Sequence, residues 1–349
     1  RRKSRKVKVG KLFIGGNAPI PIQSMTTTDT TDVKATVEQI HGLEEIGCDI
    51  IRVSAPTMEA AKALKEIREN ISIPLVVDIH FDYRIALEAV KYVVKLRINP
   101  GNIGNPDKVQ QVVKACKDYS VPMRVGVNLG SLERDLFEKY GYAPEAMVES
   151  AMRHVKILED LDFYDTIVSL KASDVPRMVK AYKLFAEKTD YPLHLGVTEA
   201  GSKLPGAIKS AMGMGMLLSE GIGDTIRVSL SDDPKEEVKI GKLILRSLGL
   251  RNDGVQITSC PTCARTEIDV IKLVEQLENA TEKIKKPVHV AVMGCAVNGP
   301  GESRKADLGI VGAPGNHLLY KDGKIVRRIN DNEIKEVLLK EINEMANES

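Results

Sequence analysis

The sequence of 349 residues contains no tryptophan, and aromatic residues make up only 4% of it. Proteins that bind single-stranded nucleic acid stack the bases on exposed aromatic rings, so this composition argues against such a function. The formal net charge of +2 also gives no strongly basic surface for a nucleic-acid backbone. We therefore expect no nucleic-acid partner.

Long apolar runs are also missing. No stretch approaches the roughly 20 apolar residues that a membrane-spanning helix needs. The basic residues 1–6 are not followed by the apolar segment of a secretory signal. A hydrophobic share of 43% and a charged share of 28% are typical of soluble, well-cored domains. These features predict a cytosolic protein that does not enter a membrane.

Cysteine is scarce and unevenly spaced. The five cysteines are Cys48, Cys116, Cys260, Cys263 and Cys295. An odd number without an export signal indicates a reducing compartment, where cysteines serve metal binding or catalysis more often than disulfides. We expect Cys48 and Cys116 to be small buried hydrophobic residues outside any site.

Eight β-branched runs alternate with amphipathic helical stretches between residues 21 and 248. In order, the runs are IPIQSM, CDIIRVS, PLVVDIH, VVKLRIN, PMRVGVN, TIVSLKA, PLHLGVT and TIRVSLS. The helix after the last run begins with Asp233 and Pro234, an N-cap followed by a proline at the first helical position. The pattern predicts an α/β fold, a TIM (β/α)8 barrel over residues 1–250 with the hairpin VKVGKLFIGG at its floor. A doubly wound open sheet is the alternative, but no GxGxxG motif follows an early strand.

The pattern changes after the turn-rich segment RNDG. Strands are predicted at VQITS, VHVAVMG and LGIVGA and in the hairpin LLYKDGKIVRRI, with helices after CPTC and from about Asn332. We expect a second, smaller α+β domain over residues 251–349 with a core of its own.

Cationic side chains lie in or near the ends of five predicted barrel strands. They are Arg52, Arg97, Arg124, Lys171 and Arg227. Active sites of TIM barrels lie at the carboxyl ends of the strands. Buried charges need partners, but the acids available are few, chiefly Asp78 and Glu199. The surplus predicts an anionic ligand, and guanidinium groups suit a diphosphate. An internal network of ion pairs is the alternative.

Other polar residues share these strand ends. They are Asp78, His80, Asn99, Asn128, His194, Thr198 and Ser229. Asparagine and serine side chains there can donate hydrogen bonds to the hydroxyls or phosphates of a substrate. Glu199, just beyond the seventh strand, is the candidate for proton transfer. We regard the two histidines as supporting residues.

The remaining cysteines form a constellation in the second domain. Cys260 and Cys263 stand in a CPTC turn after one strand, and Cys295 follows another strand in the loop CAVNGPGE. Three thiolates with one oxygen ligand suit a [4Fe–4S] cluster, and Glu302 is the nearest carboxylate in the same loop. A structural zinc ion, which takes four protein ligands, is the alternative.

The segments CPTCART and MGCAVNGPGE resemble those of the 4-hydroxy-3-methylbut-2-enyl diphosphate synthases, the GcpE family of the non-mevalonate isoprenoid pathway. The resemblance extends through PIQSMTTTDT, IIRVSAP, DIHFDYR, LRINPGNIG, GVTEAG and TIRVSLS, and so covers both domains. The two-domain layout is similar to the bacterial form of the family.

This resemblance implies an iron–sulfur oxidoreductase with a [4Fe–4S] cluster held by Cys260, Cys263, Cys295 and Glu302. The implied substrate is 2-C-methyl-D-erythritol 2,4-cyclodiphosphate, which is opened and dehydroxylated by two electrons from a flavodoxin or ferredoxin. Glu199 would act as the acid or base. The diphosphate would be held by Arg52, Arg97, Arg124, Asn128, Lys171 and Arg227.

Two other functions stay open. PIQSMTTTDTTD also resembles the first-strand loop of dihydropteroate synthase, which would make the chain a pterin-binding barrel transferase with a zinc site. A non-enzymatic electron carrier is the second alternative, but it would not need five barrel cations.

The path of the chain predicts an oligomer. The helix from Pro234 to about Leu248 returns the chain by roughly 20 Å, about the height of a barrel, to the floor. The turn at Arg251–Gly254 is too short to climb back to the mouth. We therefore expect a head-to-tail homodimer in which the second domain of one chain covers the barrel of the other.

Overall fold

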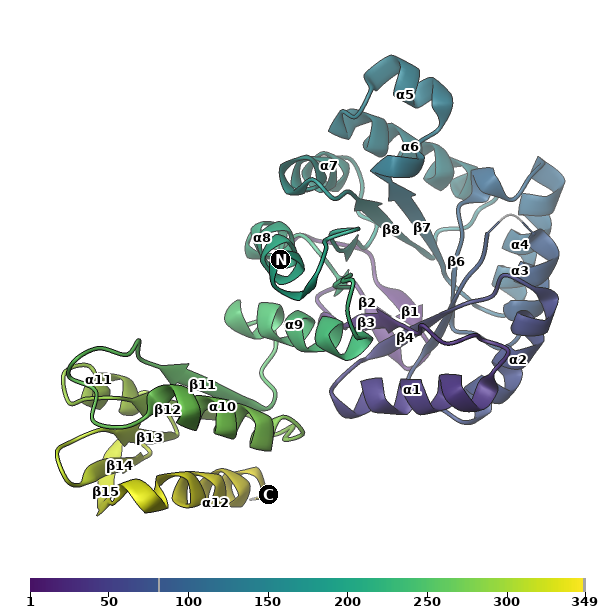
Figure 1. The fold of residues 1–349 in the computed structure, drawn as a ribbon. Coiled ribbons are helices and arrows are strands. Elements are labelled where there is room, and N and C mark those ends of the chain that lie inside the picture. Colours follow the sequence, from purple (N-terminus) through teal and green to yellow (C-terminus); the bar gives the residue numbers. More distant parts are fainter. Residues whose placement is uncertain (81, 348–349) are drawn as a thin grey trace. The chain divides into compact units, whose positions relative to one another are not determined.

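The structure is a computed structural model that describes residues 1–80 and 82–347. The chain divides into two compact units, Arg1–Arg251 and Asn252–Ser349, and each is described by itself (Figure 1).

The first unit is built on eight parallel strands: β3 (Gln23–Met25), β4 (Ile50–Ser54), β5 (Leu75–Asp78), β6 (Lys95–Arg97), β7 (Met123–Asn128), β8 (Thr166–Lys171), β9 (His194–Leu195) and β10 (Thr225–Ile226). Strands β3 to β8 pair in sequence order, and β9 pairs with β10. Single bridges from Val168 to Leu193 and from Ile22 to Ile226 join the two sheets into a ring. The predicted eight-stranded barrel is confirmed, and the open sheet is excluded.

Helices surround this ring (Figure 1): α1 (Val33–Glu45), α2 (Met58–Glu69), α3 (Tyr83–Ala89), α4 (Pro106–Asp118), α5 (Arg134–Tyr140), α6 (Pro144–Glu159), α7 (Val175–Lys188), α8 (Lys203–Ser219) and α9 (Pro234–Ser247), with 3-10 turns at Pro100–Asn102 and Leu129–Ser131. Their apolar faces pack on the strands, as Ile40 and Leu43 of α1 illustrate, both being fully buried. The predicted start of α9 is confirmed, because the Asp233 side chain accepts a hydrogen bond from the Lys235 amide and Pro234 follows it.

The floor of the barrel is closed by an antiparallel hairpin, β1 (Val7–Val9) and β2 (Leu12–Ile14). Its buried side chains pack against Ile50, Val76 and Ile167 from inside the barrel. Because side chains alternate along a strand, the inward positions beyond this apolar layer fall on polar residues such as Lys95 and Arg97. The lumen is therefore apolar at the floor and charged toward the mouth.

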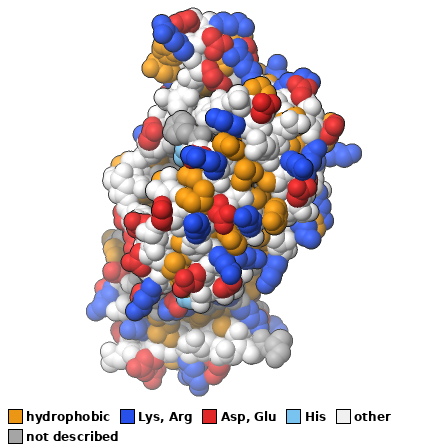
Figure 2. Space-filling view, turned by 90° about the vertical axis from the view of Figure 1, so that its right-hand side faces the viewer, with side chains coloured by type: hydrophobic (Ala, Val, Ile, Leu, Met, Phe, Trp, Pro, Cys, Tyr) orange, Lys and Arg blue, Asp and Glu red, His pale blue; other side chains and the backbone are white. Residues whose placement is uncertain are grey.

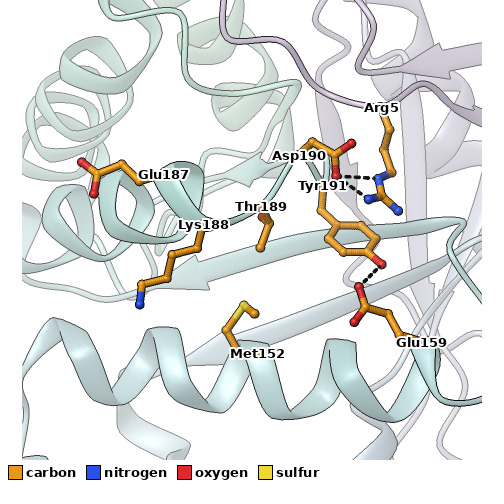
Figure 3. Close-up of a pocket in the computed structure, with 8 residues that line it drawn as sticks. All are labelled: Arg5, Met152, Glu159, Glu187, Lys188, Thr189, Asp190 and Tyr191. Carbon is orange, nitrogen blue, oxygen red and sulfur yellow. Dashed lines mark hydrogen bonds and ion pairs between the residues drawn. The ribbon is translucent and has the colours of Figure 1, made fainter.

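A hollow of about 330 Å³ lies on the floor side, between α6 and the segment that leads into β9 (Figure 3). Two of its side-chain pairs lie within its own wall. Arg5 donates to Asp190 over 2.9 Å, and the Tyr191 hydroxyl donates to Glu159 over 2.9 Å. The Arg5 guanidinium also stacks 3.8 Å from the centre of the Tyr191 ring. These contacts tie the N-terminal segment to the barrel.

The second unit is a five-stranded sheet of order β11 (Val255–Ser259), β12 (Val288–Met293), β13 (Leu308–Val311), β14 (His317–Lys321) and β15 (Lys324–Ile329). Strands β11, β12 and β13 are parallel to one another. Strand β14 pairs antiparallel with β13, and β15 pairs antiparallel with β14. Helices α10 (Val270–Thr281) and α12 (Ile334–Asn347), the latter preceded by a 3-10 turn at Asp331–Glu333, share one apolar core with the sheet. The short helix α11 (Gly299–Ser303) contacts β12 and β13. This is the predicted α+β layout.

The surface carries charges of both signs. On the face shown in Figure 2, lysine and arginine side chains are intermixed with aspartate and glutamate, in keeping with a net charge of +2. Among the described residues, no helix is both long enough and apolar enough to cross a membrane.

Candidate active site

A pocket of about 220 Å³ opens at the carboxyl ends of the barrel strands. Its wall is formed by Arg52, Asp78, His80, Arg97, Arg124, Gly126, Asn128, Ser169, Lys171, Thr198, Arg227 and Ser229. All five cations predicted from the strand ends contribute, and they come from strands β4, β6, β7 and β8 and from the residue after β10. The barrel topology therefore gathers these side chains at one place, where the fold usually keeps its active site.

Asp78 is the acid at the centre of this pocket. Its carboxylate accepts a hydrogen bond from Arg97 Nη1 at 2.9 Å, and Arg52 Nε lies 3.7 Å from its other oxygen. His80 Nε2 is 3.3 Å away. Burial opposes ionisation of Asp78, but the hydrogen bond from His80 and the charges of Arg52 and Arg97 outweigh it, so its pKa lies well below its usual range. Asp78 is thus a carboxylate.

One carboxylate does not balance the cations around it. Burial, aided by the charge of Arg227, lowers the pKa of Arg52 to about 9. The same two causes lower the pKa of the Lys171 ammonium well below its ordinary value. Arg124 is 3% exposed; it donates to the Ser169 hydroxyl over 3.0 Å, and its Nε has no partner among the described residues. A bound anion would stabilise this arrangement, as the strand-end cations predict.

Two buried ionisable residues near the pocket were not predicted from the sequence. Lys95 lies fully buried one pleat below Arg97, and its Nζ donates to Gln23 Oε1 over 3.1 Å. The period-2 alternation along β6 placed it on the same face as Arg97 and could have found it. Glu237, 5% exposed on the first turn of α9, supplies a second acid near the pocket.

Three predicted site residues lie outside the pocket wall. The Asn99 amide is engaged by backbone, since it donates to the Gly126 carbonyl and accepts from the Gly126 amide, each over 2.9 Å. His194 is fully buried, and burial, then the charge of Lys171, lowers its pKa well below 6.5, so the ring is neutral. Glu199 is exposed beyond β9 with a left-handed backbone, φ +52°. Substrate contacts for these three residues stay predictions.

The three cysteines of the second unit lie at one edge of its sheet, beyond the carboxyl ends of two neighbouring strands. Cys260 follows β11 and Cys295 follows soon after β12, and these strands are parallel neighbours in which Ser259 pairs with Val292. The Gly294 amide donates to Cys260 Sγ over 3.1 Å. The Glu267 amide donates to the Gly294 carbonyl over 2.8 Å, which ties the CPTC loop to the Cys295 loop. Cys263 is exposed in the same loop.

Glu302 belongs to the same edge through α11, where it is half-buried and pairs with Lys305 at 3.2 Å. The available donors are three thiols and this carboxylate. Within residues 1–80 and 82–347, no three histidine, cysteine or acidic side chains gather tightly enough to hold a single metal ion. The donor set and the amide that donates to a sulfur fit a larger iron–sulfur group, in which such N–H···S bonds are usual.

Comparison with known families agrees with this layout. The family model of the GcpE TIM-barrel domain matches residues 4–242, and that of the GcpE protein C-terminal domain matches residues 256–344. The chain belongs to the GcpE family. Its two matched segments correspond to the barrel and the second sheet of this GcpE chain.

Relatives of this GcpE chain match along its whole length. A 4-hydroxy-3-methylbut-2-en-1-yl diphosphate synthase (flavodoxin) from Geobacillus thermodenitrificans is 57% identical over 100% of this chain and 94% of its own length. The protein of the same name from Bacillus subtilis is 56% identical over 100% of this chain and 93% of its own.

Two solved structures resemble about 71% of this chain. The phospho-2-dehydro-3-deoxyheptonate aldolase of Thermotoga maritima matches with a TM-score of 0.50 and 11% identity over 71% of this chain and 73% of its own. The dihydropteroate synthase of Yersinia pestis matches with a TM-score of 0.50 and 10% identity over 71% of this chain and 100% of its own. At this identity the likeness concerns the fold. A pterin-dependent transferase activity gains no support from it.

Replacement of Asp78 by asparagine should destabilise the protein in a pH-dependent way. The variant leaves Arg97 buried without its carboxylate, which should cost about 3 kcal/mol at pH 6. Since the folded-state pKa of Asp78 lies below its unfolded value of about 3.9, its contribution is complete above that pH and declines as the pH falls further. Urea unfolding of both proteins should therefore show a smaller difference at pH 3 than at pH 6. An equal difference at both pH values would contradict this assignment.

Proposed function

We propose that this chain produces 4-hydroxy-3-methylbut-2-enyl diphosphate, the compound for which its relatives are named, from 2-C-methyl-D-erythritol 2,4-cyclodiphosphate. The observation that carries the proposal is identity of 57% to such a synthase across all of this chain. The cationic barrel pocket supports it independently, because a cyclic diphosphate is the kind of anion that its charges require.

The reaction is a two-electron reduction. One ring C–O bond to phosphate breaks, one hydroxyl leaves as water, and a carbon–carbon double bond forms, with two electrons and two protons taken up. In the pocket, Arg52, Arg97, Arg124, Lys171 and Arg227 would hold the diphosphate. Asn128, Thr198 and Ser229, which also line it, would donate to phosphate or hydroxyl oxygens. Orienting the ring in this way removes much of the entropic cost of the reaction.

Cys260, Cys263, Cys295 and Glu302 would hold a [4Fe–4S] cluster. When bound, the cluster supplies electrons one at a time and, at the iron held by the weaker oxygen ligand, a coordination site for substrate. A flavodoxin would be the electron donor, as in the names of the relatives, with a ferredoxin as the alternative. The exposure of Cys263 supports access by such a protein.

Glu199 would transfer the proton. Its exposed carboxylate stands in the loop after β9, directly after the pocket residue Thr198. A non-glycine residue with φ +52° is strained, and such strain is common where a side chain must be aimed at a reaction. Because Glu199 directly follows Thr198, a change in its side-chain rotamer could bring the carboxylate to the side of the pocket that Thr198 lines.

The assay of this function is anaerobic turnover of the cyclic diphosphate by the reconstituted protein with a chemical or flavodoxin reductant. Glu199→Gln should preserve the fold and iron content but slow turnover by roughly a hundredfold or more, the usual effect of positioned proton transfer. Substrate binding should change less than turnover. A variant with the normal rate would leave Glu199 without a chemical role, and an inactive wild type would contradict the function itself.

The fourth ligand is tested separately. Glu302→Ala should lower the iron content of the anaerobically reconstituted protein toward three irons per chain, because a three-thiol set leaves one iron weakly held. Glu267→Ala removes an exposed carboxylate from the CPTC side of the same edge and serves as the control. Iron analysis and electron paramagnetic resonance give the result. Full iron content and unchanged turnover in Glu302→Ala would exclude the assignment.

The function also requires the cluster and the pocket to meet, and we propose that they do so between two chains. Arg251 pairs with Asp49 at 2.6 Å, and Asp49 immediately precedes β4 at its amino end. The chain therefore leaves the first unit at the floor, away from the pocket. Residues 252–254 can span at most about 11 Å, whereas a six-residue strand rises about 20 Å. A second chain arranged head to tail would bring its cluster to this pocket.

An apolar face on α8 supports contact with such a second chain. Four side chains at intervals of four residues are exposed by about half or more: Leu204 (71%), Ile208 (52%), Met212 (56%) and Met216 (48%). Because this spacing places them on one side of the helix, they form a continuous apolar stripe, of the kind that marks protein interfaces.

Complementation tests the shared site. A chain with Glu199→Gln and a chain with Cys260→Ser are each expected to be nearly inactive. In a mixed dimer, one site combines an intact barrel with an intact cluster, so subunit exchange should restore activity to about a quarter of the wild-type level, given one working site in the half of the dimers that are mixed. Differently tagged chains allow the mixed dimers to be isolated. Mixed dimers without recovered activity would refute the shared site.

A further inference from the structure

Glu237 is a buried acid behind the pocket wall, and neither the sequence motifs nor the proposed reaction accounts for it. It lies on the first turn of α9 and is 5% exposed. Its Oε1 accepts a hydrogen bond from the Leu230 amide over 2.9 Å. Leu230 directly follows Ser229, which lines the pocket, so Glu237 holds the backbone of the loop that carries Ser229.

The second oxygen of Glu237 is directed at a pocket cation. Oε2 lies 3.9 Å from Arg227 Nε, and within the described part of the chain neither atom has a hydrogen-bond partner. The separation is somewhat longer than a hydrogen bond. A small rotation of either side chain would close it and fix one edge of the guanidinium group, so that the remaining N–H donors face the pocket.

The charge of Glu237 is costly in this position. Burial raises the pKa of its carboxyl, although the charges of Arg227 and then Lys171 oppose this effect. A negative charge beside an anion-binding pocket also repels the anion. Simple electrostatics therefore predicts that removal of the Glu237 charge should tighten binding of a diphosphate. An orienting function predicts the opposite.

We propose that Glu237 is a positioning residue for diphosphate binding, which aims Arg227 and secures the loop after β10. This inference rests on the proposed function, since it assumes that the pocket holds a diphosphate. The loop is also linked to the neighbouring one, because the Ser231 amide donates to the Gly201 carbonyl over 2.9 Å. Gly201 lies two residues after Glu199, so Glu237 contributes to the placement of both loops at this side of the mouth.

The test uses inorganic pyrophosphate and the intact holoenzyme in isothermal titration calorimetry. Glu237→Gln keeps a carbonyl oxygen for the Leu230 amide but removes the charge that faces Arg227. We expect pyrophosphate to bind about tenfold more weakly, because Arg227 loses the carboxylate that would accept a hydrogen bond from its Nε when the anion is bound. Glu236→Gln is the matched control, because Glu236 has the same charge on the same turn but pairs with Lys203 and Lys239. Its affinity should be unchanged.

A second variant separates orientation from folding. Arg227→Lys cannot use a guanidinium edge, so Glu237→Gln should weaken binding much less in that background than in the wild type. Equal losses in both backgrounds would show that Glu237 acts through general stability and would overturn the inference, as would unchanged or tighter binding by Glu237→Gln alone. A wild type that does not bind pyrophosphate would contradict the diphosphate pocket. If Glu237→Gln then also has the melting temperature of the wild type, the positioning function of Glu237 fails as well.

Discussion

The positive charge in the barrel lumen is the constraint on which the rest of this molecule depends. Arg52, Arg97 and Arg124 are each less than 10% exposed, and Asp78 is the acid that contacts this group most closely. Burying such a set is costly, so a scaffold must hold it in place, and a bound anion would stabilise it. The closed ring of strands provides the scaffold. The hairpin beneath it excludes water from the floor, which strengthens every electrostatic interaction above.

In the second unit, too, the candidate functional side chains follow the carboxyl ends of parallel strands, but here they are cysteine thiols. Two parallel strands, β11 and β12, each deliver a cysteine at their carboxyl ends, and the amide of Gly294 is directed at one sulfur. The cationic side chains and the three thiols are thus kept in separate units of the chain. This separation has a chemical reason, because thiolates placed among the barrel arginines would compete with the diphosphate for the same charges.

The barrel could be predicted because its strands are buried on both faces and therefore appear as continuous β-branched runs. Even β9 and β10, which form only two regular residues each, were visible in this way. The pocket cations were visible because an arginine inside an apolar run is rare. The contacts that side chains make across the folded structure could not be predicted from the sequence. Nothing in the sequence indicates that the Asn99 amide is occupied by Gly126, or which of Glu236 and Glu237 faces inward, since packing decides both.

Two glycines leave space for the cationic side chains of the pocket. A Cβ atom on Gly126 would lie 3.0 Å from Arg97 Nε and 3.3 Å from the Ser169 hydroxyl, and one on Gly196 would lie 2.7 Å from Lys171 Nζ. The missing side chains leave room for long cationic side chains to lie across the lumen instead of extending out of it. Alanine at position 126 would displace the Arg97 guanidinium without changing the net charge, and alanine at position 196 would also meet the backbone carbonyl of Arg227 at 2.4 Å. Only glycine at both positions lets the strands and the cations keep their places.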